Sequence, residues 1–155
     1  MQNIKGRVGG KYKGYDINMQ LTAESVKGRI GGKIQGGNLE MQITGEAIRG
    51  RVGTRIFGYA IKFTRTETGL TGNIGKMYQV EIQQAGNAFS GWMGHSLLPR
   101  DIDLIWDNGK LSGRIGQDFF GKNLYLEGDA DADPAVLAAI ACTSFMWFIE
   151  TAPKR

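Results

Sequence analysis

Residues 135–149, AVLAAIACTSFMWFI, carry no charged side chain on any face of the helix they would form. A helix at a protein surface has one apolar stripe, whereas a helix that is apolar all round has to be buried all round. Asp133 supplies a capping carboxylate and Pro134 suits a first helical turn, so the sequence predicts a helix over residues 134–151. The rest of the chain must enclose this helix, and no other feature constrains the fold as strongly.

A short motif occurs six times before this helix: an apolar residue, any residue, glycine, any residue, an apolar residue and glycine. Its copies begin 22, 22, 22, 19 and 22 residues apart. Self-similarity at a nearly fixed period indicates a repeat architecture. The copies are IKGRVG from Ile4, VKGRIG from Val26, IRGRVG from Ile48, LTGNIG from Leu70, FSGWMG from Phe89 and LSGRIG from Leu111.

Each copy continues into a second stretch in which apolar and polar residues alternate, as in YDINMQLT from Tyr15 and YAIKFT from Tyr59. Alternation with a period of two indicates a strand with one buried face. Turn residues separate the stretches, and Asn108-Gly109 is a strong hairpin dipeptide. The sequence therefore predicts six hairpins, or twelve antiparallel strands over residues 4–128, in one domain of residues 1–155.

Dimensions connect the strands with the helix. Twelve strands tilted by about 40° close into a barrel of roughly 12 Å radius, whose bore, once lined with side chains, is about 10–12 Å wide and fits one α-helix. We therefore expect a mainly β fold: a closed twelve-stranded antiparallel barrel of six hairpin repeats around a central apolar C-terminal α-helix. The first glycine of each motif shares the inward face, and we expect these glycines to make room for the helix.

Two other placements of the helix compete with the filled barrel. One is a membrane tail anchor, although the apolar run of 15 residues is shorter than the ~20 that a span requires. The other is a parallel β-solenoid with the helix capping one end, which would bury only one stripe of the helix.

Motifs for catalysis are weak in this sequence. Cys142 lies in the apolar run, where burial would make it inert, and the single histidine, His95, has no nucleophile pattern around it. The sequence shows no phosphate loop, paired-carboxylate pattern or metal-ligand spacing. We therefore predict no enzyme activity, no catalytic residue, no metal site and no cofactor. One cysteine and no apolar leader segment near residue 1 favour a cytoplasmic protein.

Charge is distributed unevenly along the chain. Residues 1–69 hold 12 Lys/Arg and 5 Asp/Glu, whereas residues 70–155 hold 7 and 10. Cations at outward positions of the first three copies predict a basic band on the outer wall, suited to the phosphates of lipid headgroups or nucleic acid. The alternative is cross-strand pairing with Asp16 and Glu40, or simple solvation. The band consists of Lys5, Arg7, Lys27, Arg29, Arg49, Arg51, Lys62 and Arg65.

Two further surface features are predicted. Trp92 and Ile105 alternate with inward residues on neighbouring strands, so both should point outward as a contact patch for a partner or a bilayer. Three alternating carboxylates before the helix are spaced like the start of a calcium loop. The chain has Pro134 and Ile140 where an EF-hand needs Gly and Glu, so we expect Asp133 to cap the helix instead.

The predicted architecture resembles the tubby-like superfamily, in which twelve antiparallel strands surround an apolar C-terminal helix. Tubby C-terminal domains, phospholipid scramblases and LURP-one-related proteins share this fold. The local likeness is to the scramblase C-terminal helix, where an acidic stretch precedes an Ala/Val/Ile-rich run with a cysteine and an aromatic end. The matching positions here are Asp129, Asp131 and Asp133, then residues 136–142, then residues 145–150.

The resemblance implies a binding role. Tubby domains bind phosphoinositides through basic residues on the barrel wall, and scramblases couple calcium to the acidic segment, which implies a weak cation site over residues 129–133. We expect a non-enzymatic, monomeric module that recognises anionic phospholipid, phosphoinositide-like surfaces through the basic band, peripheral to membranes and without a transmembrane span. The alternatives are a structural or protein-interaction domain with no lipid role, and a nucleic-acid-binding domain that uses the same band.

Overall fold

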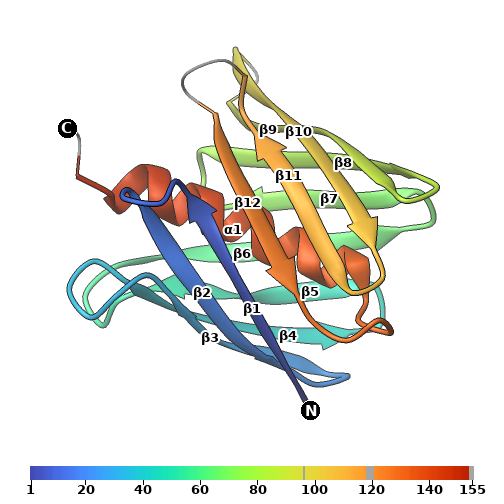
Figure 1. Cartoon of the computed structure of the whole chain (residues 1–155), viewed down its shortest axis with the longest axis horizontal. Coiled ribbons are helices and arrows are strands. Elements are labelled where there is room, and N and C mark those ends of the chain that lie inside the picture. Colours follow the sequence, from blue (N-terminus) through green and yellow to red (C-terminus); the bar gives the residue numbers. More distant parts are fainter. Residues whose placement is uncertain (96, 118–120, 154–155) are drawn as a thin grey trace.

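The structure, a computed structural model, describes residues 1–95, 97–117 and 121–153. Over these residues, twelve strands follow one another along the chain, and each pairs antiparallel with both neighbours until β1 closes onto β12 (Figure 1). The predicted closed barrel of hairpins is confirmed, and the solenoid is excluded. The strands are β1 (Gln2–Gly9), β2 (Gly14–Leu21), β3 (Ser25–Ile30), β4 (Gly37–Thr44), β5 (Ala47–Gly53), β6 (Gly58–Thr66), β7 (Gly69–Ile74), β8 (Tyr78–Ala85), β9 (Ala88–His95), β10 (Leu98–Asp107), β11 (Lys110–Ile115) and β12 (Lys122–Glu127).

The helix α1 (Pro134–Thr151) runs through the barrel, as Figure 1 shows. Asp133 caps it, because its side chain accepts a hydrogen bond from the backbone N–H of Ala135 at 3.0 Å. Every residue from Val136 to Phe148 is buried. The helix is long and apolar enough to cross a membrane, but 72% of it is buried inside the barrel, so no transmembrane span is indicated.

The motif glycines are required by the wall itself. A Cβ atom on the first motif glycine of any copy would lie less than 3.0 Å from a backbone carbonyl oxygen of the neighbouring strand, and the three nearest atoms all belong to that strand. The expected reason for these glycines, room for α1, is thus replaced by a nearer obstacle. The pairs of glycine and carbonyl are Gly6 with Tyr125, Gly28 with Asn18, Gly50 with Glu40, Gly72 with Lys62, Gly91 with Glu81 and Gly113 with Asp103.

The second motif glycine lies where the first strand of each hairpin ends. Its φ angle is positive in every copy, from 61° at Gly75 to 157° at Gly53, a region that residues other than glycine rarely adopt. The predicted turn at Asn108-Gly109 is also confirmed, because both residues have positive φ, as a type I′ hairpin turn requires.

One buried hydroxyl gives a prediction for stability. Within the described part of the chain, Ser144 Oγ is the buried side-chain polar atom that has no hydrogen-bond partner. Because an unsatisfied buried polar group costs about 1–3 kcal/mol, Ser144→Ala should raise the free energy of unfolding by about 1 kcal/mol in urea titrations. Thr143→Val is the matched control, because the Thr143 hydroxyl already donates to Ala139 O at 2.8 Å and its removal should bring no gain. A less stable Ser144→Ala variant would contradict this prediction.

Candidate functional site

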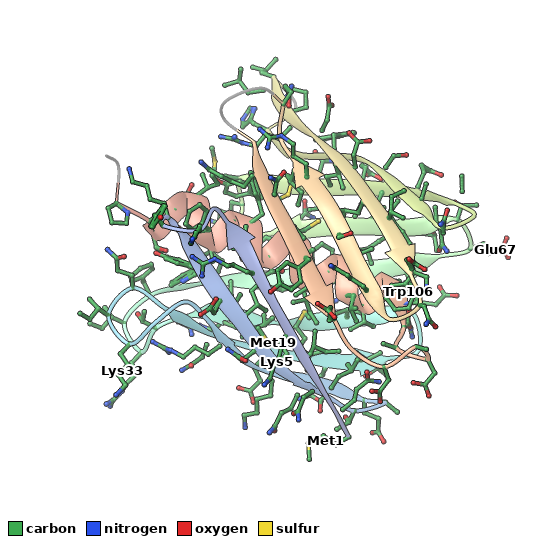
Figure 2. All side chains as sticks on the ribbon, in the orientation of Figure 1. Met1, Lys5, Met19, Lys33, Glu67 and Trp106 are labelled. Carbon is green, nitrogen blue, oxygen red and sulfur yellow. The ribbon has the colours of Figure 1, made fainter. Side chains whose placement is uncertain are left out.

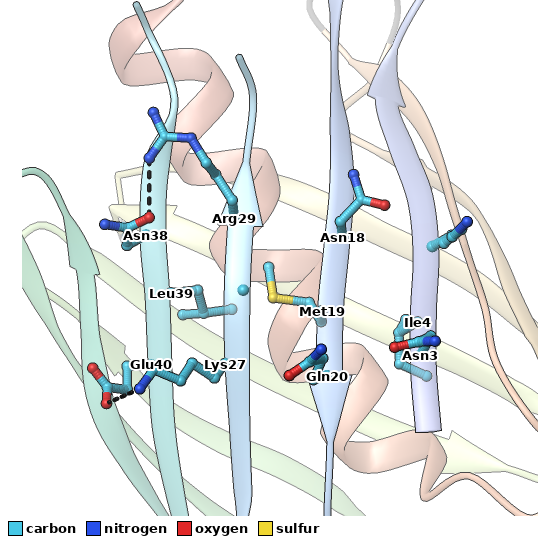
Figure 3. A pocket seen from close by; sticks show the side chains of 12 residues that line it. Asn3, Ile4, Asn18, Met19, Gln20, Lys27, Arg29, Asn38, Leu39 and Glu40 are labelled. Carbon is cyan, nitrogen blue, oxygen red and sulfur yellow. Dashed lines mark hydrogen bonds and ion pairs between the residues drawn. The ribbon is translucent and has the colours of Figure 1, made fainter. Parts of the chain in front are cut away.

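The outer face of β1–β4 carries a shallow groove of about 540 Å³, named here the wall groove (Figure 3). Two rows of polar side chains cross the four strands, one on each side of a row of inward-facing residues that forms the floor. The rows lie two residues apart along each strand, or about 7 Å. The first row is Asn3, Gln20, Lys27 and Glu40; the second is Lys5, Asn18, Arg29 and Asn38; the floor is Ile4, Met19, Gly28 and Leu39.

Cations outnumber carboxylates in the wall groove. Lys27 Nζ lies 3.7 Å from Glu40 Oε1, but both side chains are mostly exposed, so this ion pair is weak. Arg29 donates to Asn38 Oδ1 at 2.9 Å, which leaves its positive charge in place (Figure 3). Lys5 is exposed on β1. Three cations therefore face one carboxylate among the lining residues, and the amide side chains add further hydrogen-bond donors.

Several arginines of the predicted band hold the hairpin loops. Arg7, Arg29 and Arg51 each donate to the backbone carbonyl three residues ahead, at 2.9, 2.8 and 2.9 Å respectively. Arg7 also pairs with Asp16 at 2.7 Å. The cross-strand pairing that competed with a binding role is thus present at Asp16 and, weakly, at Glu40, and it lowers the number of cations available to a ligand.

The remaining band residues lie in two places. Arg49 on β5 donates to the carbonyls of Ile48 and Phe63, and Lys62 lies opposite it on β6. Arg65 lies at the end of the barrel where α1 begins. There it forms an ion pair with Asp133 and donates to Gly45 O at 2.5 Å. The structure therefore gives Arg65 a separate position, where it tethers the helix cap to the wall.

The predicted apolar patch is divided in the structure. Trp92 is half-buried and lies opposite Asp101 on β10, whereas Ile105 is exposed and lies opposite Ala88 on β9. Trp92 and Ala88 are four residues apart on β9, so roughly 13 Å of strand separates the two sites. The register does not bring Trp92 and Ile105 together.

The acidic segment and the cysteine have structural surroundings. Asp133 caps α1, and among the described residues no group of three or more His, Cys, Asp or Glu side chains is arranged to hold a metal ion. Cys142 is fully buried in the core, and desolvation raises the pKa of its thiol to about 12. Its thiolate, the reactive form, is therefore scarce at neutral pH.

Sequence reasoning missed the amide side chains of the wall groove. Asn18 and Gln20 lie in register with Arg29 and Lys27 on the next strand. The sequence did carry a signal for them, because both amides occupy outward positions on a strand that lies between two strands with outward cations. Comparisons with models of known families, with characterised proteins and with solved structures find no match to this chain, so the resemblance to tubby-like proteins stays a prediction.

Proposed function

We propose that this barrel is a non-enzymatic binding module whose wall groove recognises the phosphate groups of anionic, phosphoinositide-like phospholipids. The observation that carries the proposal is the pair of polar rows on β1–β4, in which three cations face one carboxylate. Phosphate oxygens accept hydrogen bonds, and the lysine, arginine and amide side chains of these rows supply donors.

The filled bore supports a site on the outer wall. Because α1 is buried from Val136 to Phe148, it occupies the space in which a barrel would otherwise hold a ligand. The donors of the wall groove project from four paired strands of a closed sheet, so the backbone positions that carry them are fixed before a ligand arrives. The resemblance to tubby domains favours the same class of ligand.

The distribution of cations favours a headgroup over nucleic acid. A nucleic-acid site needs a long basic track along successive phosphates. Here Arg7 is paired with Asp16, and Arg65 is paired with Asp133 at the barrel end. These pairs interrupt the band, whereas the cations of the wall groove surround one compact groove of about 540 Å³.

The test removes two charges from the wall groove. We expect the wild-type chain to bind vesicles containing phosphatidylserine and phosphatidylinositol bisphosphate, and to be released as salt rises. Each basic residue near an anionic surface contributes about 1 kcal/mol, so Lys5→Gln/Lys27→Gln should weaken binding about 30-fold in co-sedimentation assays. Lys62→Gln/Lys110→Gln is the matched control, because it removes the same charge from exposed residues outside the groove.

Three results would reject the proposal. The first is binding to anionic vesicles that is no tighter than binding to phosphatidylcholine vesicles. The second is an equal loss in the groove variant and in the control, which would indicate net charge rather than a site. The third is tighter binding to a DNA duplex than to the vesicles, which would favour the nucleic-acid alternative.

A further inference from the structure

Four hairpin loops lie at the end of the barrel where α1 ends, and together they form what we name the loop rim: residues 10–13, 31–36, 54–57 and 75–77. Large apolar side chains stand out into solvent from each of these loops. Ile34 is 95% exposed, Ile56 is 93% exposed and Tyr12 is 89% exposed. Neither Ile34 nor Ile56 belongs to the hydrophobic core or packs against it. The two isoleucine side chains therefore contribute nothing to the packing of the core.

A cation stands beside each of these apolar tips. Lys33 precedes Ile34, Arg55 precedes Ile56 and Lys76 precedes Met77, while Tyr12 lies between two lysines. No residue of the loop rim is acidic. The carboxylate of Glu150, near the end of α1, accepts a hydrogen bond from the Tyr78 hydroxyl at 2.5 Å. Cation and apolar side chain thus recur together in four successive hairpins.

The opposite end of the barrel has the reverse character. Its turns and strand ends carry exposed carboxylates, and among the described residues the large apolar side chains exposed near that end are Met1 and, on the wall, Ile105. Figure 2 shows Lys33 at one end of the molecule and Glu67 and Met1 away from it. The two ends of the barrel therefore differ in both charge and hydrophobicity. The carboxylates are Glu24, Glu46, Glu67, Asp107, Asp129 and Asp131.

The loops of the rim are held by the barrel. Arg29 donates to Gly32 O at 2.8 Å, and Arg51 donates to Thr54 O at 2.9 Å. Phe57 stacks on Trp147 of α1 with ring centroids 5.9 Å apart, and Trp147 Nε1 donates to Gln35 O at 3.2 Å. The end of the buried helix thus contacts two of these loops and fixes their backbone, while the exposed apolar side chains at their tips point into solvent.

We infer that the loop rim is a second lipid contact, which seats on an anionic bilayer with its apolar tips among the headgroups. Basic residues close to apolar ones suit this interface, because the cations are drawn to anionic headgroups while the apolar side chains reach the acyl boundary. The acidic turns at the other end are repelled by the same surface, which orients the barrel. The inference rests on the proposed function for its class of partner but uses a different surface.

The experiment compares Ile34→Ser/Ile56→Ser with wild type by co-sedimentation with 70:30 phosphatidylcholine:phosphatidylserine vesicles. The variant keeps every charge and loses two exposed apolar side chains, so any loss of binding reports the apolar contact. We expect it to bind at least tenfold more weakly than wild type, with the greatest difference at 0.5 M NaCl, where charge attraction is screened. Ile105→Ser, an exposed isoleucine on the wall, is the control and should bind like wild type. Equal unfolding midpoints in urea verify that the fold is intact, as exposure of both isoleucines predicts.

The experiments can reject the wall groove and the loop rim independently of each other. If Ile34→Ser/Ile56→Ser binds like wild type while Lys5→Gln/Lys27→Gln is weakened, the loop rim inference is overturned and the wall groove stands. If only the rim variant is weakened, the wall groove is rejected and the loop rim stands. No vesicle binding by the wild-type chain overturns both. If sedimentation velocity shows that the isoleucines hold a dimer together and vesicle binding is unchanged, the rim is a self-association surface and the inference falls.

Discussion

A chain truncated after Asp133 is expected to lose cooperative folding. The truncation removes α1, whose residues from Val136 to Phe148 are all buried in the barrel. Seven of them are large and apolar, and their burial contributes roughly 10–20 kcal/mol at 1.5–3 kcal/mol each. A whole domain is stable by only about 5–15 kcal/mol. The seven are Val136, Leu137, Ile140, Phe145, Met146, Trp147 and Phe148.

Urea titration monitored by circular dichroism measures this loss. The wild-type chain should unfold in one cooperative transition, whereas the truncated chain should show no transition and a spectrum without native strand content. A chain truncated after Ala152, which keeps α1 and its C-cap, is the control and should unfold like wild type. A cooperative transition without α1 would show that the wall is stable alone and that the helix only fills a preformed bore.

Local chemistry explains why the elements were predictable from sequence. The bounds of α1 follow from the Asp133 cap, from Pro134 at the first turn and from the absence of charge, and none of these depends on distant residues. The hairpins follow from period-two alternation and from turn residues such as Asn108-Gly109. Closure of the sheet needed one additional step: only a barrel buries all faces of one helix.

Long-range register explains what sequence reasoning missed. Arg65 has the inward parity of Ile61 and Phe63 on β6, and it pairs with Asp133, 68 positions later, because the helix begins at that end of the barrel. Trp92 and Ile105 lie on neighbouring strands, but the pairing of β9 with β10 sets them apart. The loop rim could have been predicted, since a cation stands beside an apolar residue in four aligned loops.

Gly50→Ala is expected to destabilise the barrel strongly. A methyl group there would lie against the backbone of β4, at Glu40 and Met41, so relief would require movement of one strand relative to the other. Overpacking in a well-packed site costs about 1–3 kcal/mol, and a backbone obstacle places Gly50 at the upper end. The melting temperature should fall by roughly 6–12 °C, since 1 kcal/mol corresponds to about 2–4 °C in a chain of this size.

Gly32→Ala should have the opposite sign. Gly32 lies in the β3–β4 loop, its φ is outside the positive region, and no heavy atom lies within 4 Å of the position of an added Cβ. Alanine there restricts the unfolded chain, so this variant should gain about 0.4–1 kcal/mol. Differential scanning calorimetry of the two variants separates strand geometry from a general effect of replacing glycine.

The recurrence of the motif makes this prediction stricter. Gly6 and Gly91 meet the same obstacle as Gly50, a carbonyl oxygen of the neighbouring strand, so Gly6→Ala and Gly91→Ala should cost a similar amount. If room for the helix were the requirement instead, the cost would vary with the size of the α1 residue nearest to each glycine. Similar losses of stability at all three positions would therefore show that the repeat preserves close contact between strands. Unequal losses would instead indicate that the glycines make room for the helix.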